Sequence, residues 1–137
     1  MNNSNYIVIT YCKAFFNELK IVYEDVFKRE FLQSEKYDKR FKFDEKYSSY
    51  LLLERNTNKI KGHIGFKIFN LNEKYGGLIA FRYSTFVSNQ IRGMGIYQYF
   101  FNEIKKNIRN EFNLKYIFAW PNTANLISCL KDKDYVN

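Results

Sequence analysis

Hydrophobic positions change their spacing several times along the chain, and each spacing predicts a different element. Tyr6 to Thr10 is a short β-branched run, which is typical of a strand. From Lys13 to Leu32 the apolar residues recur every three or four positions, and this spacing gives an amphipathic helix one apolar face. Residues 33–49 show no clear period. We expect only a short helix or a loop there.

The middle of the chain has the alternation and the turn residues of antiparallel strands. A strand is predicted from Ser49 to Glu54, and the turn residues at 56–58 reverse it into a second strand from Ile60 to Phe69. Another turn at 73–77 leads to Leu78–Val87. That last run is more continuously apolar, which predicts a strand buried on both faces.

The final third returns to helical spacing. A helix is predicted from Arg92 to about Asn110, then a strand from Tyr116 to Trp120 that Pro121 stops, then a helix over Thr123–Lys131. The order strand, helix, three strands, helix, strand, helix predicts an α/β (α+β) fold. Its sheet should be mixed, mainly antiparallel and flanked by helices. The 137 residues fit one domain, 1–137.

Composition narrows the class of protein. Hydrophobic residues make up 46% of the chain, which excludes intrinsic disorder, and most of the Tyr and Phe residues fall at core spacing. The first five residues lack the features of a secretory signal, and no apolar run approaches the ~20 residues of a membrane span. Cys12 and Cys129 lie far apart and form no metal motif. We expect a cytoplasmic protein with free thiols and no metal.

The net charge of +8 predicts attraction to anions such as nucleic acid, an anionic membrane or a phosphorylated small molecule. The excess lies in residues 51–100, which hold seven basic side chains against Glu54 and Glu73. An AT-rich genome would enrich the same Lys, Asn, Ile and Tyr codons, so the charge alone does not choose a partner. A nucleic-acid-binding module, which aromatic side chains would also suit, stays open as an alternative.

The segment from Val87 to Tyr97 carries the clearest chemical signal. A strand runs into the turn Gln90-Ile-Arg-Gly93-Met-Gly95, and a helix follows at once. Such a turn gathers backbone N–H groups at the positive end of a helix dipole, which is a site for phosphate. Glycines let the backbone approach an oxygen closely and adopt unusual φ values, and Arg92 adds a positive charge. The dinucleotide fingerprint and the nucleoside-triphosphate loop do not match.

The pattern Gln90-x-x-Gly93-x-Gly95 resembles the GCN5-related N-acetyltransferase (GNAT) superfamily. In that family this segment holds the pyrophosphate of acetyl-coenzyme A, and the strand before it lies along the pantetheine arm. The sequence Phe118-Ala-Trp-Pro121-Asn122 is similar to the Pro-Asn segment of one GNAT branch, where the strand that carries it splays from the preceding strand and admits the cofactor.

The resemblance implies a role for each matching residue. Backbone groups of Phe86 and Val87 would bind the pantetheine, and Asn122 would touch it from the final helix. Backbone N–H groups from Gln90 through Ile96 would hold the pyrophosphate, with the side chains of Gln90 and Arg92 at its edge. The implied cofactor-binding residues are Phe86, Val87, Gln90, Ile91, Arg92, Gly93, Met94, Gly95, Ile96 and Asn122. The implied activity is direct transfer of an acetyl group from acetyl-CoA to an amine of a small metabolite, a sugar or a protein.

The sequence also departs from the family. The usual tyrosine acid falls on Leu130, a usual glycine is Asp134, and residues 81–86 contain no glutamate to act as a base. The catalytic acid and base are therefore unassigned. A catalytically inactive GNAT-like domain used for assembly is a further alternative.

The end of the chain differs as well. GNAT domains add two strands after the final helix, and only Val136 and Asn137 follow Tyr135. We therefore expect a domain truncated at its C-terminal end, either as part of a longer chain or completed by a partner such as a second copy. The strand at 116–120 would then have an uncovered edge.

Four single residues are interpreted as structural. His63 shares a strand face with Lys61 and Lys67, so we expect a solvated histidine without a catalytic role. Cys129 is expected to be a buried thiol in the last helix. Glu54 and Glu73 are expected to be solvated charges.

Overall fold

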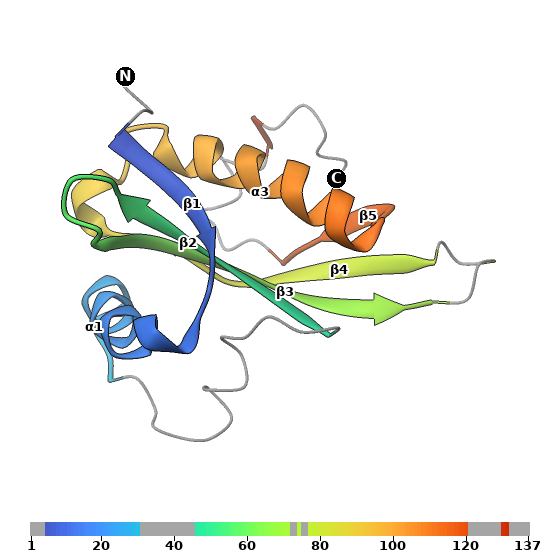
Figure 1. Cartoon of the computed structure of the whole chain (residues 1–137), viewed down its shortest axis with the longest axis horizontal. Coiled ribbons are helices and arrows are strands. Elements are labelled where there is room, and N and C mark those ends of the chain that lie inside the picture. The colour runs from blue at the N-terminus through green and yellow to red at the C-terminus, as the bar shows by residue number, and fades with distance from the viewer. Residues whose placement is uncertain (1–4, 31–45, 72–73, 75–76, 121–129, 132–137) are drawn as a thin grey trace.

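The computed structural model describes residues 5–30, 46–71, 74, 77–120 and 130–131 (Figure 1). Within these ranges the elements are β1 (Tyr6–Thr10), a 3₁₀ turn (Lys13–Phe15), α1 (Phe16–Phe27), β2 (Tyr47–Glu54), β3 (Ile60–Asn70), β4 (Leu78–Val87), a second 3₁₀ turn (Asn89–Ile91), α3 (Ile96–Phe112) and β5 (Tyr116–Phe118). None of the described helices is both long and apolar enough to cross a membrane.

The strands form one sheet in the order β1-β2-β3-β4-β5. The first four strands pair antiparallel, and β5 joins the edge of β4 in parallel. The short loops between β2, β3 and β4 permit hairpins, whereas the parallel pair needs the crossover that α3 supplies. The predicted mixed, mainly antiparallel sheet with flanking helices is confirmed.

The helices cover opposite faces of the sheet, so the core has two layers (Figure 1). The first layer packs against α1, and its buried members include Leu19, Tyr23, Leu51, Ile60 and Phe86. The second layer packs against α3, and its buried members include Leu52, Ile64, Phe66, Ile96, Phe100, Ile104 and Ile108. Alternation along β2 places Leu51 and Leu53 toward α1, and Tyr50 and Leu52 toward α3. Both faces of the sheet are therefore apolar and covered.

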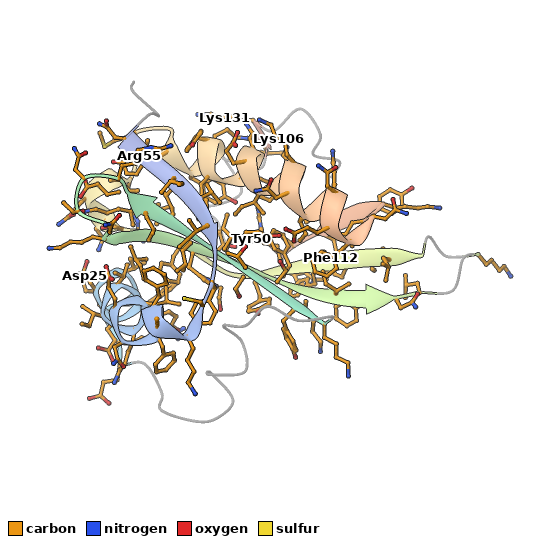
Figure 2. All side chains as sticks on the ribbon, viewed as in Figure 1. Asp25, Tyr50, Arg55, Lys106, Phe112 and Lys131 are labelled. Atoms are coloured by element: carbon orange, nitrogen blue, oxygen red, sulfur yellow. The ribbon has the colours of Figure 1, made fainter. Side chains whose placement is uncertain are left out.

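Tyr50 belongs to the α3 layer and shows how polar atoms are satisfied there (Figure 2). Its hydroxyl donates to the Glu111 carboxylate at 3.2 Å, so one aromatic ring joins the middle of the sheet to the last turn of α3. Burial is the main influence that raises the pKa of Tyr50 above its ordinary value. The hydroxyl therefore keeps its proton and remains a donor.

Several element ends differ from the predictions for reasons of backbone conformation. Lys28 adopts a left-handed conformation (φ 52°) and ends α1 five residues before the predicted Leu32. Left-handed conformations at Gly93 and Gly95 delay α3, which begins at Ile96 and not at the predicted Arg92. The strand β5 ends at Phe118, two residues early. The helix predicted over 123–131 lies outside the described residues except for its last two.

Two predictions of burial are wrong. Only Ala80, Arg82 and Phe86 are buried along β4, and its other residues are half-buried. Phe86 is the one β4 residue in the α1 layer, so α1 covers only the end of this strand. The expected solvated His63 is fully buried. It shares a face with the exposed Lys67, but α1 and Phe86 cover the face around His63. Lys61 lies at an irregularity in the pairing of β2 with β3, which interrupts the alternation between it and His63.

Candidate functional site

The sheet opens on one side of β4. The pairing of β4 with β5 stops at Phe81 and Phe118, whereas its pairing with β3 continues to Val87. In the described part of the chain, no strand therefore pairs with this edge of β4 from Arg82 to Val87. Backbone N–H and C=O groups on such an edge can bind an extended ligand as a strand would.

A β-bulge lies in the open half of β4. Gly65 pairs with Tyr83 and His63 pairs with Phe86, so two residues of β4, Ser84 and Thr85, stand opposite one residue of β3. Ser84 adopts φ 44°, and its carbonyl oxygen lies 2.6 Å from Nδ1 of His63. The sequence pattern gives no sign of this bulge, because it depends on how β4 registers with β3.

The turn after β4 presents its backbone to solvent. Arg92, Gly93, Met94 and Gly95 are all exposed, while Ile91 before them and Ile96 after them are buried and anchor the turn to the α3 layer. The two glycines have φ values of 75° and 72°, which other residues adopt only with strain. A Cβ on either glycine would meet nothing within 4 Å. Glycine at positions 93 and 95 is therefore explained by the left-handed backbone and by access of a ligand to the backbone, and not by close packing within the protein.

The first turn of α3 is suited to an anion. Gly95 is its N-cap residue, so no side chain caps the first N–H groups, and no acidic side chain lies in that turn. Uncapped N–H groups and the helix dipole give this end a partial positive charge. The geometry that the sequence predicted for a phosphate is therefore present between Arg92 and Ile96.

Charged residues from two other elements reach the turn. The Lys61 ammonium on β3 donates to the Gln90 side chain at 2.8 Å and lies 3.9 Å from the Glu54 carboxylate. Glu54 is partly exposed and is paired with Lys61 and Thr57, and is not the lone solvated charge that the sequence predicts. The salt bridge to Lys28, with a smaller contribution from Arg92, holds the pKa of Asp25 below its usual range. Each lysine is paired with a carboxylate, so among these five groups Arg92 supplies the one excess positive charge.

Lys61 is a candidate ligand that the sequence analysis missed. It lies 29 positions before Gln90, and only the register that pairs Gly62 with Val87 brings it beside the turn. The amide of Ser88 also donates to the Lys61 carbonyl at 2.7 Å. Neither contact leaves a signal in the spacing of residues along the chain.

Arg82 lies where β5 leaves β4. Its guanidinium is buried, donates to the Tyr97 hydroxyl at 2.6 Å and lies 4.9 Å from the centre of the Phe101 ring. Tyr97 and Phe101 stack along α3 with ring centres 6.2 Å apart. The three side chains connect the open half of β4 to the first two turns of α3, next to the glycine turn.

The other residues singled out in the sequence differ in where the structure places them. The Phe86 side chain packs under α1 and that of Val87 packs toward α3, so only their backbone could face a ligand at the open edge. Gln90 and Arg92 are exposed at the turn. Asn122, Cys129, Glu73 and Asp134 lie outside the described residues. Within the described ranges, no cluster of His, Cys, Asp or Glu could hold a metal ion.

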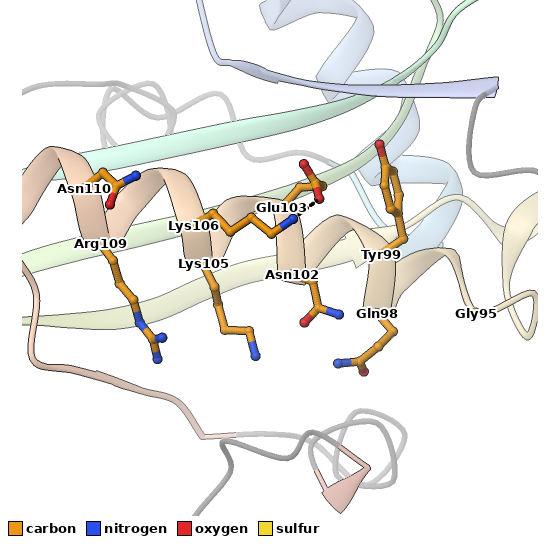
Figure 3. A pocket seen from close by; sticks show the side chains of 9 residues that line it. All are labelled: Gly95, Gln98, Tyr99, Asn102, Glu103, Lys105, Lys106, Arg109 and Asn110. Carbon is orange, nitrogen blue, oxygen red and sulfur yellow. Dashed lines mark hydrogen bonds and ion pairs between the residues drawn. The ribbon is translucent and has the colours of Figure 1, made fainter.

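A groove of about 760 Å³ begins at Gly95 and follows α3 away from the open edge of β4 (Figure 3). The side chains of Gln98, Asn102, Lys105 and Arg109 point to the same side of the helix along it. The groove meets the predicted site only at Gly95. It is polar and basic, and we assign it no part of the acyl-transfer chemistry.

Comparisons with known proteins give similarity in structure but not in sequence. No protein-family model matches the chain, and no curated protein matches it. Among solved structures, an aminoglycoside acetyltransferase from an uncultured soil metagenomic sample, in complex with sisomicin, is 15% identical with a TM-score of 0.79. The match covers 100% of this chain and 93% of that one.

Two further solved acetyltransferase structures are similar to this chain. A GNAT family acetyltransferase from Staphylococcus aureus is 19% identical with a TM-score of 0.72, and the match covers 97% of this chain and 93% of that one. The acetyltransferase AAC(6')-Iy, in complex with the bisubstrate analogue CoA-S-monomethyl-acetylneamine, is 10% identical with a TM-score of 0.68. This match covers 96% of this chain and 93% of the other. At these identities the likeness establishes the fold.

Proposed function

On the premise that this chain has the GNAT fold, we propose that it is an N-acetyltransferase. It binds acetyl-coenzyme A and passes the acetyl group directly to the amine of a small metabolite, a sugar or a protein. The observation that carries the proposal is the continuity of the open edge of β4, the exposed glycine turn and the uncapped first turn of α3. One extended ligand with a phosphate group in its middle would contact all three.

The chain's residues fit coenzyme A in a definite order. Of the two residues implied for the pantetheine arm, Phe86 and Val87, it is Val87 whose backbone groups face the open edge and bind the arm as they would bind an added strand. The N–H groups between Gly93 and Ile96 bind the pyrophosphate, and the charges of Arg92 and Lys61 lie beside it. The AAC(6')-Iy structure, which holds a bisubstrate analogue of coenzyme A, supports this class of donor.

The chemistry requires little from side chains. The amine nitrogen attacks the thioester carbonyl, a C–N bond forms, the C–S bond breaks, and the thiolate leaves. The excess proton of the amine passes to water or to the thiolate. Holding the reactants side by side can supply much of the rate enhancement, so no described side chain needs to be an indispensable base. The acetyltransferase in complex with sisomicin supports an amine acceptor.

The test is thermal unfolding with and without coenzyme A. Ligand at ~100 times its Kd stabilises the folded state by ~3 kcal/mol, which for a chain of this size raises Tm by roughly 10 °C. Gly93→Val should remove this shift, because valine strains the turn and places a branched side chain over the N–H groups. Gly77→Val is the matched control. Gly77 has φ 71° and equally open surroundings, but it lies at the other end of β4.

Two results would contradict the proposal. The first is a wild-type protein whose Tm does not change with coenzyme A but which binds an oligonucleotide with a steep salt dependence. That result would favour a nucleic-acid-binding module. The second is an equal loss of the shift in the Gly93→Val and Gly77→Val variants, because the loss would then report strain and not contact with phosphate.

A further inference from the structure

A residue of β3, His63, contacts the bulge in β4 and is the only histidine in the sequence. His63 is fully buried, and its Nδ1 atom lies 2.6 Å from the carbonyl oxygen of Ser84. A carbonyl oxygen only accepts hydrogen bonds, so Nδ1 carries the proton and donates. This bond takes the place of a ladder hydrogen bond that the extra residue of the bulge displaces.

Ser84 has a backbone conformation that needs support. Four non-glycine residues in the described chain have positive φ, and they are Lys28, Asn58, Ser84 and Asn113. Lys28 and Asn113 end helices and Asn58 lies in a turn, so Ser84 alone of the four stands inside a strand. A strained residue of this kind persists only where its surroundings hold it.

The opposite strand is shaped to hold the bulge closely. A Cβ on Gly65 would come within 2.8 Å of the Tyr83 ring and 3.2 Å of the His63 ring. The His63 ring also lies against Phe86, with ring centres 5.6 Å apart. Tyr83 and Phe86 flank the bulge in sequence, so contacts from His63 and Gly65 fix both of its ends.

The bulge decides how the rest of β4 faces the open edge. In a strand, successive peptide groups point to opposite neighbours, and one extra residue reverses this alternation for every residue after it. Phe86 and Val87 follow the bulge directly. The Ser88 amide donates to the Lys61 carbonyl on β3, so by this alternation the N–H and C=O groups of Phe86 also point to β3, and those of Val87 point to the open edge. The direction of the Val87 groups therefore depends on the conformation of Ser84.

We propose that His63 is a positioning residue that holds the Ser84 carbonyl and so orients the backbone of Val87 toward the acyl-pantetheine part of the ligand. This role rests on the proposed function. It makes no use of the glycine turn, which binds the other half of the ligand. Burial lowers the pKa of His63 to about 4, so the ring is neutral at neutral pH and does not serve as a charged group.

The test compares two ligands by calorimetric titration. Coenzyme A contacts both halves of the site, whereas adenosine 3′,5′-diphosphate lacks the pantetheine and contacts the turn alone. In His63→Leu, which keeps volume but loses the donor, the affinity for coenzyme A should fall about tenfold, the worth of one hydrogen bond. The affinity for adenosine 3′,5′-diphosphate should stay at the wild-type value. His63→Asn, whose amide nitrogen can take the place of Nδ1, should retain coenzyme A binding.

A second variant separates orientation from general damage. Glycine adopts positive φ without strain, so Ser84→Gly in the His63→Leu background should recover part of the lost affinity for coenzyme A. If His63→Leu does not fold, His63→Gln replaces it. A glutamine amide nitrogen lies nearer to the Nε2 position, so this variant should lose affinity where His63→Asn does not.

Three outcomes would overturn the role of His63. The first is a His63→Leu or His63→Gln variant that binds coenzyme A with wild-type affinity. The second is a variant that loses affinity equally for coenzyme A and for adenosine 3′,5′-diphosphate. The third is a His63→Leu variant whose affinity for coenzyme A does not recover when Ser84→Gly is added. A wild-type protein that binds neither ligand would overturn the proposed function and this role together. A wild-type protein that binds both ligands while a variant fails in one of these three ways would overturn the role of His63 alone.

Discussion

The buried His63 predicts how the stability of the protein depends on pH. Its pKa is lowered from 6.5 to about 4 in the folded state by burial, against the opposing effect of the Ser84 carbonyl. The unfolded chain therefore binds a proton more readily than the folded chain between these two values. Stability from His63 is complete above pH 6.5 and is lost as the pH falls toward 4.

The size of the effect follows from the two pKa values. One pKa unit corresponds to ~1.4 kcal/mol, so the full difference is ~3 kcal/mol, of which roughly 2 kcal/mol is lost between pH 7 and pH 5. No other histidine is present, and carboxyl groups with ordinary pKa values titrate mainly below about pH 5. The lowered pKa of Asp25 keeps that carboxyl ionised across the same range. His63 should therefore dominate this window.

The assay is urea unfolding at pH 7, 6 and 5, with the free energy of unfolding extrapolated to water. The wild type should lose about 2 kcal/mol across the series, and His63→Leu should lose almost nothing, whatever its stability at pH 7. The reasoning is refuted if the variant and the wild type show the same slope. It is also refuted if the wild type is equally stable at pH 7 and pH 5.

Three other predictions concern packing, the β4–α3 connection and the sheet edge. Ile104→Ala on the buried face of α3 should lower the free energy of unfolding by ~2–5 kcal/mol, while the exposed Ile21→Ala on α1 should change it by less than ~0.5 kcal/mol, both measured by urea unfolding. Arg82→Met should lower the free energy of unfolding by about 2 kcal/mol, again measured by urea unfolding. Tyr97→Phe should lower it by less, because the phenylalanine still stacks on Phe101. An equal or smaller loss for Arg82→Met would contradict the role of Arg82 in joining β4 to α3. In the described part of the chain β5 is an edge strand, so we predict that a second chain can pair with its outer edge, and sedimentation that shows only monomers at high concentration would contradict this.

The order of helices and strands could be predicted because the spacing of hydrophobic residues along the chain agrees with the faces that these elements bury in the fold. The bounds of β4 were predicted at both ends, since a long apolar run lies between two glycine-containing turns. The helix that begins at Ile96 was placed four residues too early, because a spacing rule does not register that Gly93 and Gly95 adopt left-handed conformations. The same glycines were still the correct sign of an exposed turn before a helix.

The site could be predicted only where it is continuous in sequence. The turn from Gln90 to Ile96 is one segment, and its geometry was anticipated. His63 was misplaced because alternation assigns a residue to a face but does not tell which part of that face α1 covers. The bulge at Ser84 and the contact of Lys61 with Gln90 both depend on the register of β3 against β4, which no local pattern specifies.

The central claim is that the glycine turn and the first turn of α3 bind the pyrophosphate of coenzyme A. The most direct measurement follows backbone amide resonances by NMR while coenzyme A is added to the wild-type protein. We predict that the amides of Gly93, Gly95 and Ile96 shift and saturate together, while the amide of Gly77, at the far end of β4, does not move. A titration that leaves these three amides unchanged, or that moves only residues along the basic face of α3, would contradict the account.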